Sequence, residues 1–267
     1  MDLQIIHDHI IVLARQAGKI IMEYFDMPIQ QSTKSNAADI VTTADKATEA
    51  LIVSALCKHY PDHHIMGEEG GGQGADASSS TYFWYVDPID GTTNFASKIP
   101  HFSTSIALAD GDLNPLVGVV YDPNRDELFS AIKGGGAWCD GEPIHVTDAT
   151  ELSQAVLASG FPYKKWTDPD NNLAEWGRFV VRTRGMRRSG SAALDACYVG
   201  AGRFDGYWER YINAWDIMAG ALIVEEAGGK LSNYKGETPS HYLDQQEIVM
   251  SNGHLHPAMI DLLNQDS

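Results

Sequence analysis

The chain has 267 residues, of which 43% are hydrophobic and 21% charged, an ordinary globular composition that suits one large domain or two closely packed layers. Its net charge of −17 argues against nucleic-acid binding, for which a basic stripe is expected. No apolar run approaches the ~20 residues of a membrane span. The N-terminus lacks signal-peptide features, and the three cysteines are widely spaced. We therefore expect a cytoplasmic protein with no membrane and no nucleic-acid partner.

Two helices are expected near the N-terminus. Apolar residues recur at spacings of three and four over residues 4–25, which predicts an amphipathic helix. After a loop, Thr42 or Thr43 is the expected N-cap of a second helix that runs to about His59. Asp45 then lies in the first turn of that helix, where the helix dipole stabilises a carboxylate. A purely structural role is therefore one interpretation of Asp45.

A glycine-rich segment and a series of strands follow. Residues 70–80 are rich in glycine, alanine and serine, which predicts a mobile surface loop. Strands are expected at 82–86, 103–109 and 116–121, and the β-rich region continues to Cys139. Pro88 is expected to end the first of these strands, because proline cannot donate a ladder hydrogen bond.

Polar residues between Thr147 and Ser153 indicate a boundary. We expect an N-terminal α+β half at 1–150 and a C-terminal α/β half at 151–267. The second half should contain a strand at 155–159 and helices at 192–201 and 214–227. Two histidine pairs, His63-His64 and His254 with His256, lack the ligand context of a zinc site, so these residues are expected on the surface or in loops.

The densest chemical signal is the heptad Asp87-Pro88-Ile89-Asp90-Gly91-Thr92-Thr93. Asp87 falls at the carboxyl end of an expected strand, where open α/β-type sheets place ligands. Two aspartates three residues apart across a turn can share Mg²⁺ ions, and the amides and hydroxyls after Gly91 can hold a phosphate. The alternative is a simple turn or helix cap. Further acidic segments at 67–70 and 215–220 favour the interpretation as a metal and phosphate site.

Several blocks of the chain, in this order, resemble the inositol monophosphatase family. They are Lys34-Ser35 with Ala38 to Asp45, Gly67-Glu68-Glu69, Asp87 to Phe95, Arg188 to Ala193, Trp208-Glu209, and Trp215 to Gly220. An ordered set of blocks is far more specific than one motif. The resemblance implies an α+β fold, the layered αβαβα sandwich of the inositol monophosphatase and fructose-1,6-bisphosphatase type, with the active site between its two halves.

The same resemblance implies a lithium-sensitive phosphomonoesterase that depends on two or three Mg²⁺ ions. The implied metal ligands are Glu68, Asp87, the carbonyl of Ile89, Asp90 and Asp216. Glu68 and Thr92 would hold the attacking water, and Asp45 would accept a hydrogen bond from the Thr92 hydroxyl. The phosphate would lie on the amides of Gly91 and Thr92. The implied polyol contacts are Gly190, Ala192 and Glu209.

The chemistry of phosphate esters agrees with such an acidic site. A monoester dianion repels an anionic attacker, whereas bound Mg²⁺ neutralises the phosphate and lowers the pKa of bound water. The expected reaction is in-line attack of a metal-activated water on a small phosphorylated polyol. We expect myo-inositol 1-phosphate as the substrate, because Glu209 stands seven residues before Asp216, where the family contacts inositol.

The sequence leaves open other substrates and another class of function. Asn213 stands where many relatives carry histidine, and histidinol phosphate, fructose 1,6-bisphosphate and adenosine 3′,5′-bisphosphate are alternative substrates. Basic residues cluster at 182–188, where Arg187 or Arg188 would attract phosphate or make a surface or dimer contact. A different class of function is a non-catalytic metabolite-sensing or protein-binding module. The family resemblance also implies a homodimer.

Overall fold

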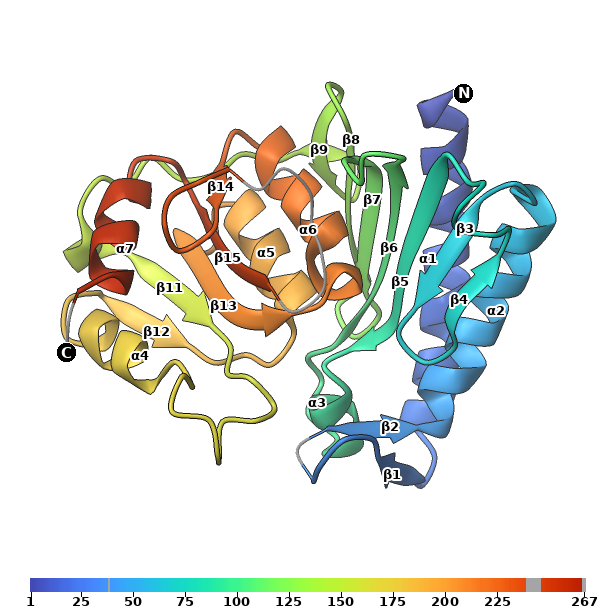
Figure 1. Cartoon of the computed structure of the whole chain (residues 1–267), viewed down its shortest axis with the longest axis horizontal. Coiled ribbons are helices and arrows are strands. Elements are labelled where there is room, and N and C mark those ends of the chain that lie inside the picture. Colours follow the sequence, from blue (N-terminus) through green and yellow to red (C-terminus); the bar gives the residue numbers. More distant parts are fainter. Residues whose placement is uncertain (38, 239–245, 266–267) are drawn as a thin grey trace.

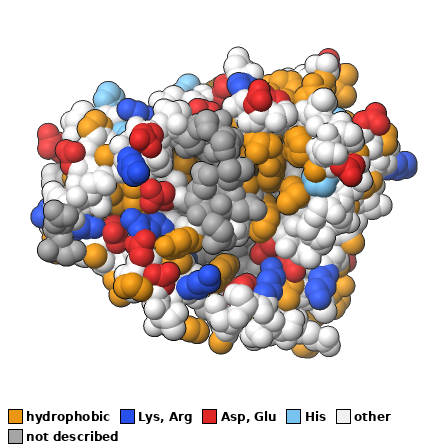
Figure 2. All heavy atoms as spheres, viewed as in Figure 1, with side chains coloured by type: hydrophobic (Ala, Val, Ile, Leu, Met, Phe, Trp, Pro, Cys, Tyr) orange, Lys and Arg blue, Asp and Glu red, His pale blue; other side chains and the backbone are white. Residues whose placement is uncertain are grey.

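The structure of the protein is a computed structural model that describes residues 1–37, 39–238 and 246–265. Ala38, in the first sequence block, lies outside the described residues. Among the helices described, none combines the length and apolar character that crossing a membrane requires. Figure 2 shows acidic and basic side chains interspersed over one face, with no continuous basic stripe among the residues drawn in colour.

Helices and sheets alternate in five layers along the longest axis of the molecule (Figure 1). The outer helices on one side are α1 (Leu3–Phe25) and α2 (Thr43–His59), the central ones are α5 (Ala192–Gly200) and α6 (Ala214–Glu226), and those on the other side are α4 (Leu173–Val180) and α7 (His256–Leu263). Between these layers lie an eight-stranded and a five-stranded sheet. The αβαβα sandwich expected from the family resemblance is therefore confirmed.

The eight-stranded sheet is antiparallel except where β3 pairs with β5. In spatial order its strands are β10 (Glu142–Pro143), β9 (Gly136–Cys139), β8 (Glu127–Ile132), β7 (Pro115–Asp122), β6 (Ser103–Asp110), β5 (Tyr82–Asp90), β3 (His64–Gly67) and β4 (Gly71–Gly74). The expected strands at 82–86, 103–109 and 116–121 are all present. Apolar side chains of one face pack on α1 and α2, and those of the other face pack on α5 and α6.

The five-stranded sheet lies between the central helices and α4 with α7. Its strands, in spatial order, are β12 (Gly185–Arg187), β11 (Val156–Ser159), β13 (Gly206–Ile212), β15 (Gln246–Ser251) and β14 (Lys230–Ser232). Strands β12, β11 and β13 run parallel, so their carboxyl ends emerge at one edge of the sheet. A short β1 (Gln31–Thr33), β2 (Ile40–Thr42) and α3 (Thr92–Ala96) complete the elements around the site, and a 3₁₀ turn spans Leu152–Gln154.

Small residues allow α6 to lie very close to its neighbours. A Cβ atom on Gly118 of β7 would lie 2.9 Å from the Cα of Ala219 in α6. A Cβ on Gly220 of α6 would lie 2.6 Å from the Cβ of Ala196 in α5. Neither contact leaves room for a side chain, so glycine is needed at both positions. The close packing holds the first turn of α6, which carries Asp216, against the end of the large sheet.

Two expectations about local structure are corrected by the pairing of strands. Strand β5 does not end at Pro88 but continues to Asp90, with a shift of register between Asp87 and Asp90 opposite β6. At such a bulge a residue without an N–H donor costs no ladder bond. The glycine-rich segment is also not wholly a loop, because Gly71–Gly74 pairs with His64–Gly67 as β4. Backbone hydrogen bonds to β3 hold Gly71–Gly74 in an extended conformation, which glycine residues do not favour by themselves.

His256 is not a surface residue, in contrast to the expectation. It is 2% exposed, and its two ring nitrogens lie 2.8 Å from the hydroxyls of Ser232 and Ser251. The ring therefore joins α7 to two strands of the smaller sheet. Burial lowers the pKa of His256 to about 4, because the charged imidazolium loses its hydration there.

The buried His256 predicts a specific loss of stability in mild acid. The unfolded chain takes up a proton near pH 6.5, whereas the folded chain does so only near pH 4, so this contribution to stability falls as the pH is lowered between these values. From pH 7.5 to 5.0 the stability advantage of the wild type over His256→Gln should shrink by about 2 kcal/mol. Urea unfolding of both proteins at the two pH values measures this difference. A constant difference would contradict the prediction.

Candidate metal and phosphate site

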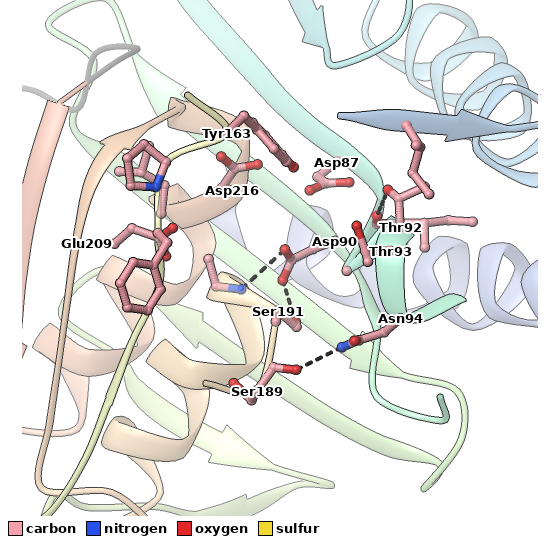
Figure 3. A pocket seen from close by; sticks show the side chains of 18 of the residues that line it. Asp87, Asp90, Thr92, Thr93, Asn94, Tyr163, Ser189, Ser191, Glu209 and Asp216 are labelled. Carbon is pink, nitrogen blue, oxygen red and sulfur yellow. Dashed lines mark hydrogen bonds between the residues drawn. The ribbon is translucent and has the colours of Figure 1, made fainter. Parts of the chain in front are cut away.

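A cavity of about 530 Å³ lies between the two sheets, where β5 ends and α5 and α6 begin. The structure brings together all but one of the predicted site residues in its wall. They are Glu68, Asp87, Ile89, Asp90, Gly91, Thr92, Gly190, Ala192, Glu209 and Asp216. Figure 3 shows Asp87 and Asp90 at the end of β5, facing Asp216 and Glu209 across the cavity. Asp45, the remaining predicted residue, lies behind Thr92.

Backbone amides and hydroxyls orient the buried aspartates. The hydroxyl of Ser191 and the amide of Ala193 donate to Oδ2 of Asp90, and the amide of Ala192 donates to Oδ1. These donors form the start of α5, whose helix dipole also stabilises a negative charge. Asp216 accepts a 3.0 Å hydrogen bond from the amide of Asn213 at the start of α6. The N-terminus of α5 therefore points at the end of β5, and the N-terminus of α6 holds its own Asp216.

Of the three aspartates, Asp87 has the weakest hydrogen-bond support for its carboxylate. It is 2% exposed, and its buried Oδ1 atom receives no hydrogen bond from any described residue. Its near neighbours are other carboxylates. The electrostatic repulsion from Glu68 raises the pKa of Asp87 most among them, followed by that from Asp90 and Asp216. A buried oxygen surrounded by negative charge is a strongly unfavourable arrangement in the absence of a cation.

The pKa values express this repulsion. Burial raises the pKa of Asp87 and Asp216 well above the ordinary range, and the neighbouring carboxylates raise them further. Burial also raises the pKa of Asp90 to about 7, although its hydrogen bonds from α5 act in the opposite direction. Clustered carboxylate oxygens and an orphaned Asp87 oxygen fit hard divalent cations such as Mg²⁺. Among the described residues, no group of three or more His, Cys, Asp or Glu side chains lies in positions that could hold a metal ion without rearrangement.

Lys34 supplies a positive charge at the edge of this cluster, a contact that the sequence motif did not reveal. Its ammonium lies 2.8 Å from Oε1 of Glu68 and also contacts Glu69. Burial alone would lower the pKa of Lys34, but the two carboxylates outweigh burial and raise it. Glu49 fixes the adjoining backbone by accepting hydrogen bonds from the amides of Glu69 and Gly70. Residue 34 is distant from Glu68 in sequence, and only the fold brings them together.

Thr92 and Asp45 form a hydrogen-bonded pair at the other side of the cluster. The Thr92 hydroxyl lies 3.2 Å from Oδ1 of Asp45 and 3.0 Å from the carbonyl of Ile89, and it can donate to either. Asp45 is fully buried and also accepts from the amide and hydroxyl of Thr42, the N-cap of α2. Burial raises its pKa to about 6. Asp45 is therefore both a helix-capping residue and a neighbour of the site.

The turn after β5 lies close against the segment that precedes α5. Gly91 has a φ of +97°, and a Cβ atom there would lie 3.1 Å from the carbonyl of Gly190. Glycine is thus required both by the left-handed conformation and by the close approach of the two turns. Asn94 locks them together, since its side-chain amide donates 2.8 Å hydrogen bonds to the carbonyls of His101 and Ser189 (Figure 3).

The far end of the cavity is formed by residues on and near β13 and β11 of the five-stranded sheet. The Glu209 carboxylate accepts a hydrogen bond from the Tyr207 hydroxyl and fills the space where a side chain on Gly160 would lie. Burial raises the pKa of Glu209, while the nearby charges of Arg188 and Lys165 oppose that rise. Glu209 can therefore present a buried, oriented acceptor to a hydroxyl group.

Tyr163 is a residue of this cavity that the sequence analysis missed. It is 51% exposed as a whole, but in Figure 3 its ring lies beside Asp216 and points towards Asp87. Burial of the hydroxyl raises its pKa, and the carboxylates of Asp216, Glu68 and Asp87 raise it further. The segment after β11 carries no motif, so a signal for this placement is absent from the local sequence.

The raised pKa values predict that metal binding stabilises the fold more at high pH. The unfolded chain loses these protons near pH 4, whereas folded Asp45 and Asp90 lose theirs near pH 6 and 7, so the metal-free fold loses stability as the pH rises through this range. A bound Mg²⁺ ion would take the place of these protons. We expect it to raise the melting temperature by about 5 °C at pH 8 and by less at pH 5.5.

Thermal scans with EDTA or with Mg²⁺ at the two pH values test this coupling. Asp90→Asn should reduce the shift at pH 8, whereas Asp112→Asn, in an exposed turn far from the cavity, should keep it. Equal shifts at both pH values would show that the carboxylates do not exchange protons for metal.

Comparison with known proteins assigns the family. The inositol monophosphatase family model matches residues 2–267. The chain is 43% identical to Nus factor SuhB of Pseudomonas aeruginosa, over 90% of this chain and 88% of that protein. It is 41% identical to the inositol-1-monophosphatase of Synechocystis, over 92% of this chain and 84% of that protein. The inositol monophosphatase structure from Anabaena superimposes with a TM-score of 0.88 at 40% identity, covering 100% of this chain and 98% of that one. The chain therefore belongs to the inositol monophosphatase family.

Proposed function

We propose that this protein is a Mg²⁺-dependent phosphatase that hydrolyses the phosphate monoester of a small polyol, with myo-inositol 1-phosphate as the preferred substrate. The observation that supports this most strongly is the buried carboxylate cluster at the end of β5, in which Asp87 Oδ1 has no donor. Such a cluster is costly in a folded protein unless it binds cations. The identity of about 40% to two inositol monophosphatases adds support for phosphatase activity.

In this proposal Glu68, Asp87, the Ile89 carbonyl, Asp90 and Asp216 hold two or three Mg²⁺ ions. When bound, the ions neutralise the phosphate, lower the pKa of water and stabilise the leaving oxygen. The protein's part is to fix the oxygen donors by the amides of α5 and α6. Lys34 neutralises Glu68 and Glu69 when no metal competes for them.

Thr92 and Asp45 would orient the attacking water. When the Thr92 hydroxyl donates to Asp45, its oxygen lone pairs face the cavity and can accept a hydrogen bond from water. Glu68 would accept the other proton of that water. The amides of Gly91 and Thr92 would hold the phosphate, and a water held opposite the leaving oxygen is positioned for in-line attack.

The polyol would occupy the end of the cavity lined by Gly190, Ala192 and Glu209. Glu209 is buried and oriented by Tyr207, so an inositol hydroxyl that donates to it would gain a charge-assisted hydrogen bond. Histidinol phosphate, fructose 1,6-bisphosphate and adenosine 3′,5′-bisphosphate are the competing substrates. We further propose a cytoplasmic, lithium-sensitive homodimer, in keeping with the family resemblance.

Phosphate release from the four candidate substrates with Mg²⁺ tests this function. We expect the highest kcat/KM for inositol 1-phosphate and a loss in Asp90→Asn that exceeds the ~100-fold effect typical of residues outside the metal ligands. Asp112→Asn is the matched control, because its side chain is exposed and remote from the cavity. Circular dichroism checks that each variant is folded. Full activity in Asp90→Asn would refute the metal assignment, and a preference for histidinol phosphate would reassign the pocket.

A second candidate role comes from the relatives that carry the name Nus factor SuhB, at 39% to 43% identity. The chain would then serve as a Nus factor beside hydrolysis or in place of it. The absence of a nucleic-acid partner, expected from the net charge, stays a prediction. Expression of Asp90→Asn in an Escherichia coli strain that lacks SuhB separates the two roles. If this variant restores the function that the strain has lost, a Nus-factor role without turnover is supported. If the wild type restores that function and the variant does not, the role depends on the metal site.

A further inference from the structure

The segment between β11 and α4 lines the cavity with Tyr163, a residue that has no role in the proposed function. The carbonyl oxygen of Tyr163 accepts a 3.4 Å hydrogen bond from the side-chain amide of Asn36, which lies between β1 and β2. In Figure 1 this segment and the β1–β2 pair lie at the lower edge of the molecule, one on each side of the seam between the sheets. The segment therefore reaches across the seam at which the carboxylate cluster lies.

Hydrogen bonds fix both ends of this segment to the five-stranded sheet. The side-chain amide of Asn172, just before α4, donates to the hydroxyl of Ser159 at 2.7 Å and to the carbonyl of Gly160 at 2.6 Å. The indole N–H of Trp208 in β13 donates to Oδ1 of Asn172 at 2.8 Å. Asn172 is 1% exposed, so water does not compete for these bonds. The closed base limits the positions that Tyr163 can adopt.

The Tyr163 hydroxyl faces the carboxylates without a hydrogen-bond partner of its own. In Figure 3 the ring lies beside Asp216 and points towards Asp87. Burial raises the pKa of the hydroxyl, and among the neighbouring carboxylates Asp216 raises it most, followed by Glu68 and Asp87. Within the described part of the chain the hydroxyl makes no hydrogen bond. A phenol at neutral pH is a donor, and the groups around it are acceptors.

The carboxylates that it faces also lack donors. The amide of Asn213 donates to Oδ2 of Asp216, and no described residue donates to Oδ1. The buried Oδ1 of Asp87 receives no hydrogen bond from a described residue either. Carboxylates that bind metal ions are normally held in place by hydrogen bonds to neighbouring groups. An unused donor thus lies next to acceptors that need one.

We propose that Tyr163 is a positioning residue of the metal site, whose hydroxyl donates a hydrogen bond to the Asp216 carboxylate and holds it in the orientation that binds Mg²⁺. The inference rests on the proposed function, since it assumes that Asp216 binds a metal ion. A carboxylate can offer one oxygen to the ion and the other to a donor. A phenol suits this role because it is neutral, so it adds no positive charge that would compete with the cation.

Metal binding without substrate tests the proposal directly. Mn²⁺ prefers the same oxygen ligands as Mg²⁺, and the electron paramagnetic resonance signal of the free ion falls as the ion binds. Tyr163→Phe removes only the hydroxyl and should raise the Kd for Mn²⁺ about tenfold. Tyr82→Phe is the matched control, because Tyr82 lies at the opposite end of β5 from the aspartates, with its ring against His63. This control should bind Mn²⁺ as the wild type does.

Two further measurements separate positioning from packing. In Tyr163→Phe the Mg²⁺ concentration for half-maximal phosphate release should rise about tenfold, whereas kcat at saturating Mg²⁺ should stay within about twofold of the wild type. The melting temperature in EDTA should stay the same. A lower melting temperature in EDTA with an unchanged Kd for Mn²⁺ would overturn the proposal, because Tyr163 would then contribute only to packing.

The same titration distinguishes a failure of this inference from a failure of the proposed function. Equal Kd values for the wild type and Tyr163→Phe would refute the role of Tyr163 and leave the metal site intact. Tighter binding by the wild type than by Tyr163→Phe, without hydrolysis of any candidate substrate, would support the role of Tyr163 and refute the phosphatase assignment. A wild type that binds no Mn²⁺ would refute both.

Discussion

Burial of like charges at the end of one strand is the constraint on which the rest of the site depends. Asp87 and Asp90 are almost fully buried, and Asp216 approaches them from another element. A low-polarity environment strengthens their repulsion and removes the hydration that would offset it. The fold tolerates this arrangement because amides at the N-termini of α5 and α6 donate to Asp90 and Asp216. The stabilisation is incomplete, and in the proposed function a divalent cation would supply the missing part.

The layered architecture explains how a single cluster can draw on both halves of the chain. Strand β5 delivers its carboxylates at the seam between the sheets, and the central helices reach the same seam with their N-termini. Close packing at Gly118 and Gly220 leaves α6 little freedom to move. A site assembled at a seam is accessible to solvent, yet its three aspartates stand on a strand and a helix rather than on loops.

The cavity has two electrostatic characters, and this distinction limits its ligands. One end is strongly acidic and suits cations together with a phosphate, while the other combines the carboxylates of Glu209 and Asp195 with the charges of Lys165 and Arg188. A ligand that fills the whole cavity must therefore present different groups to its two ends. Tyr163, whose ring lies beside Asp216, narrows the space between the loop after β11 and the cluster. Such asymmetry favours one orientation of a bound molecule.

Local sequence determined the elements that depend on neighbours along the chain. The periodicity of α1, the Thr42 cap of α2 and the alternation of the central strands are read from contiguous residues, because propensity, capping and patterning act over short distances. The family motif also indicated which acids to expect in the site. Local rules failed at Pro88 and at Gly71–Gly74, where pairing with β6 and β3 decided the structure.

Only the tertiary structure decided the contacts between distant segments. The ion pair of Lys34 with Glu68, the placement of Tyr163 at the cluster and the burial of His256 between two serines leave no mark on local sequence. Each arises because packing of the layers brings together chain segments that propensity rules treat separately. The sequence by itself thus determined the chemistry available to the site, whereas the fold determined which charges are buried together, because burial and electrostatic coupling depend on distances in space.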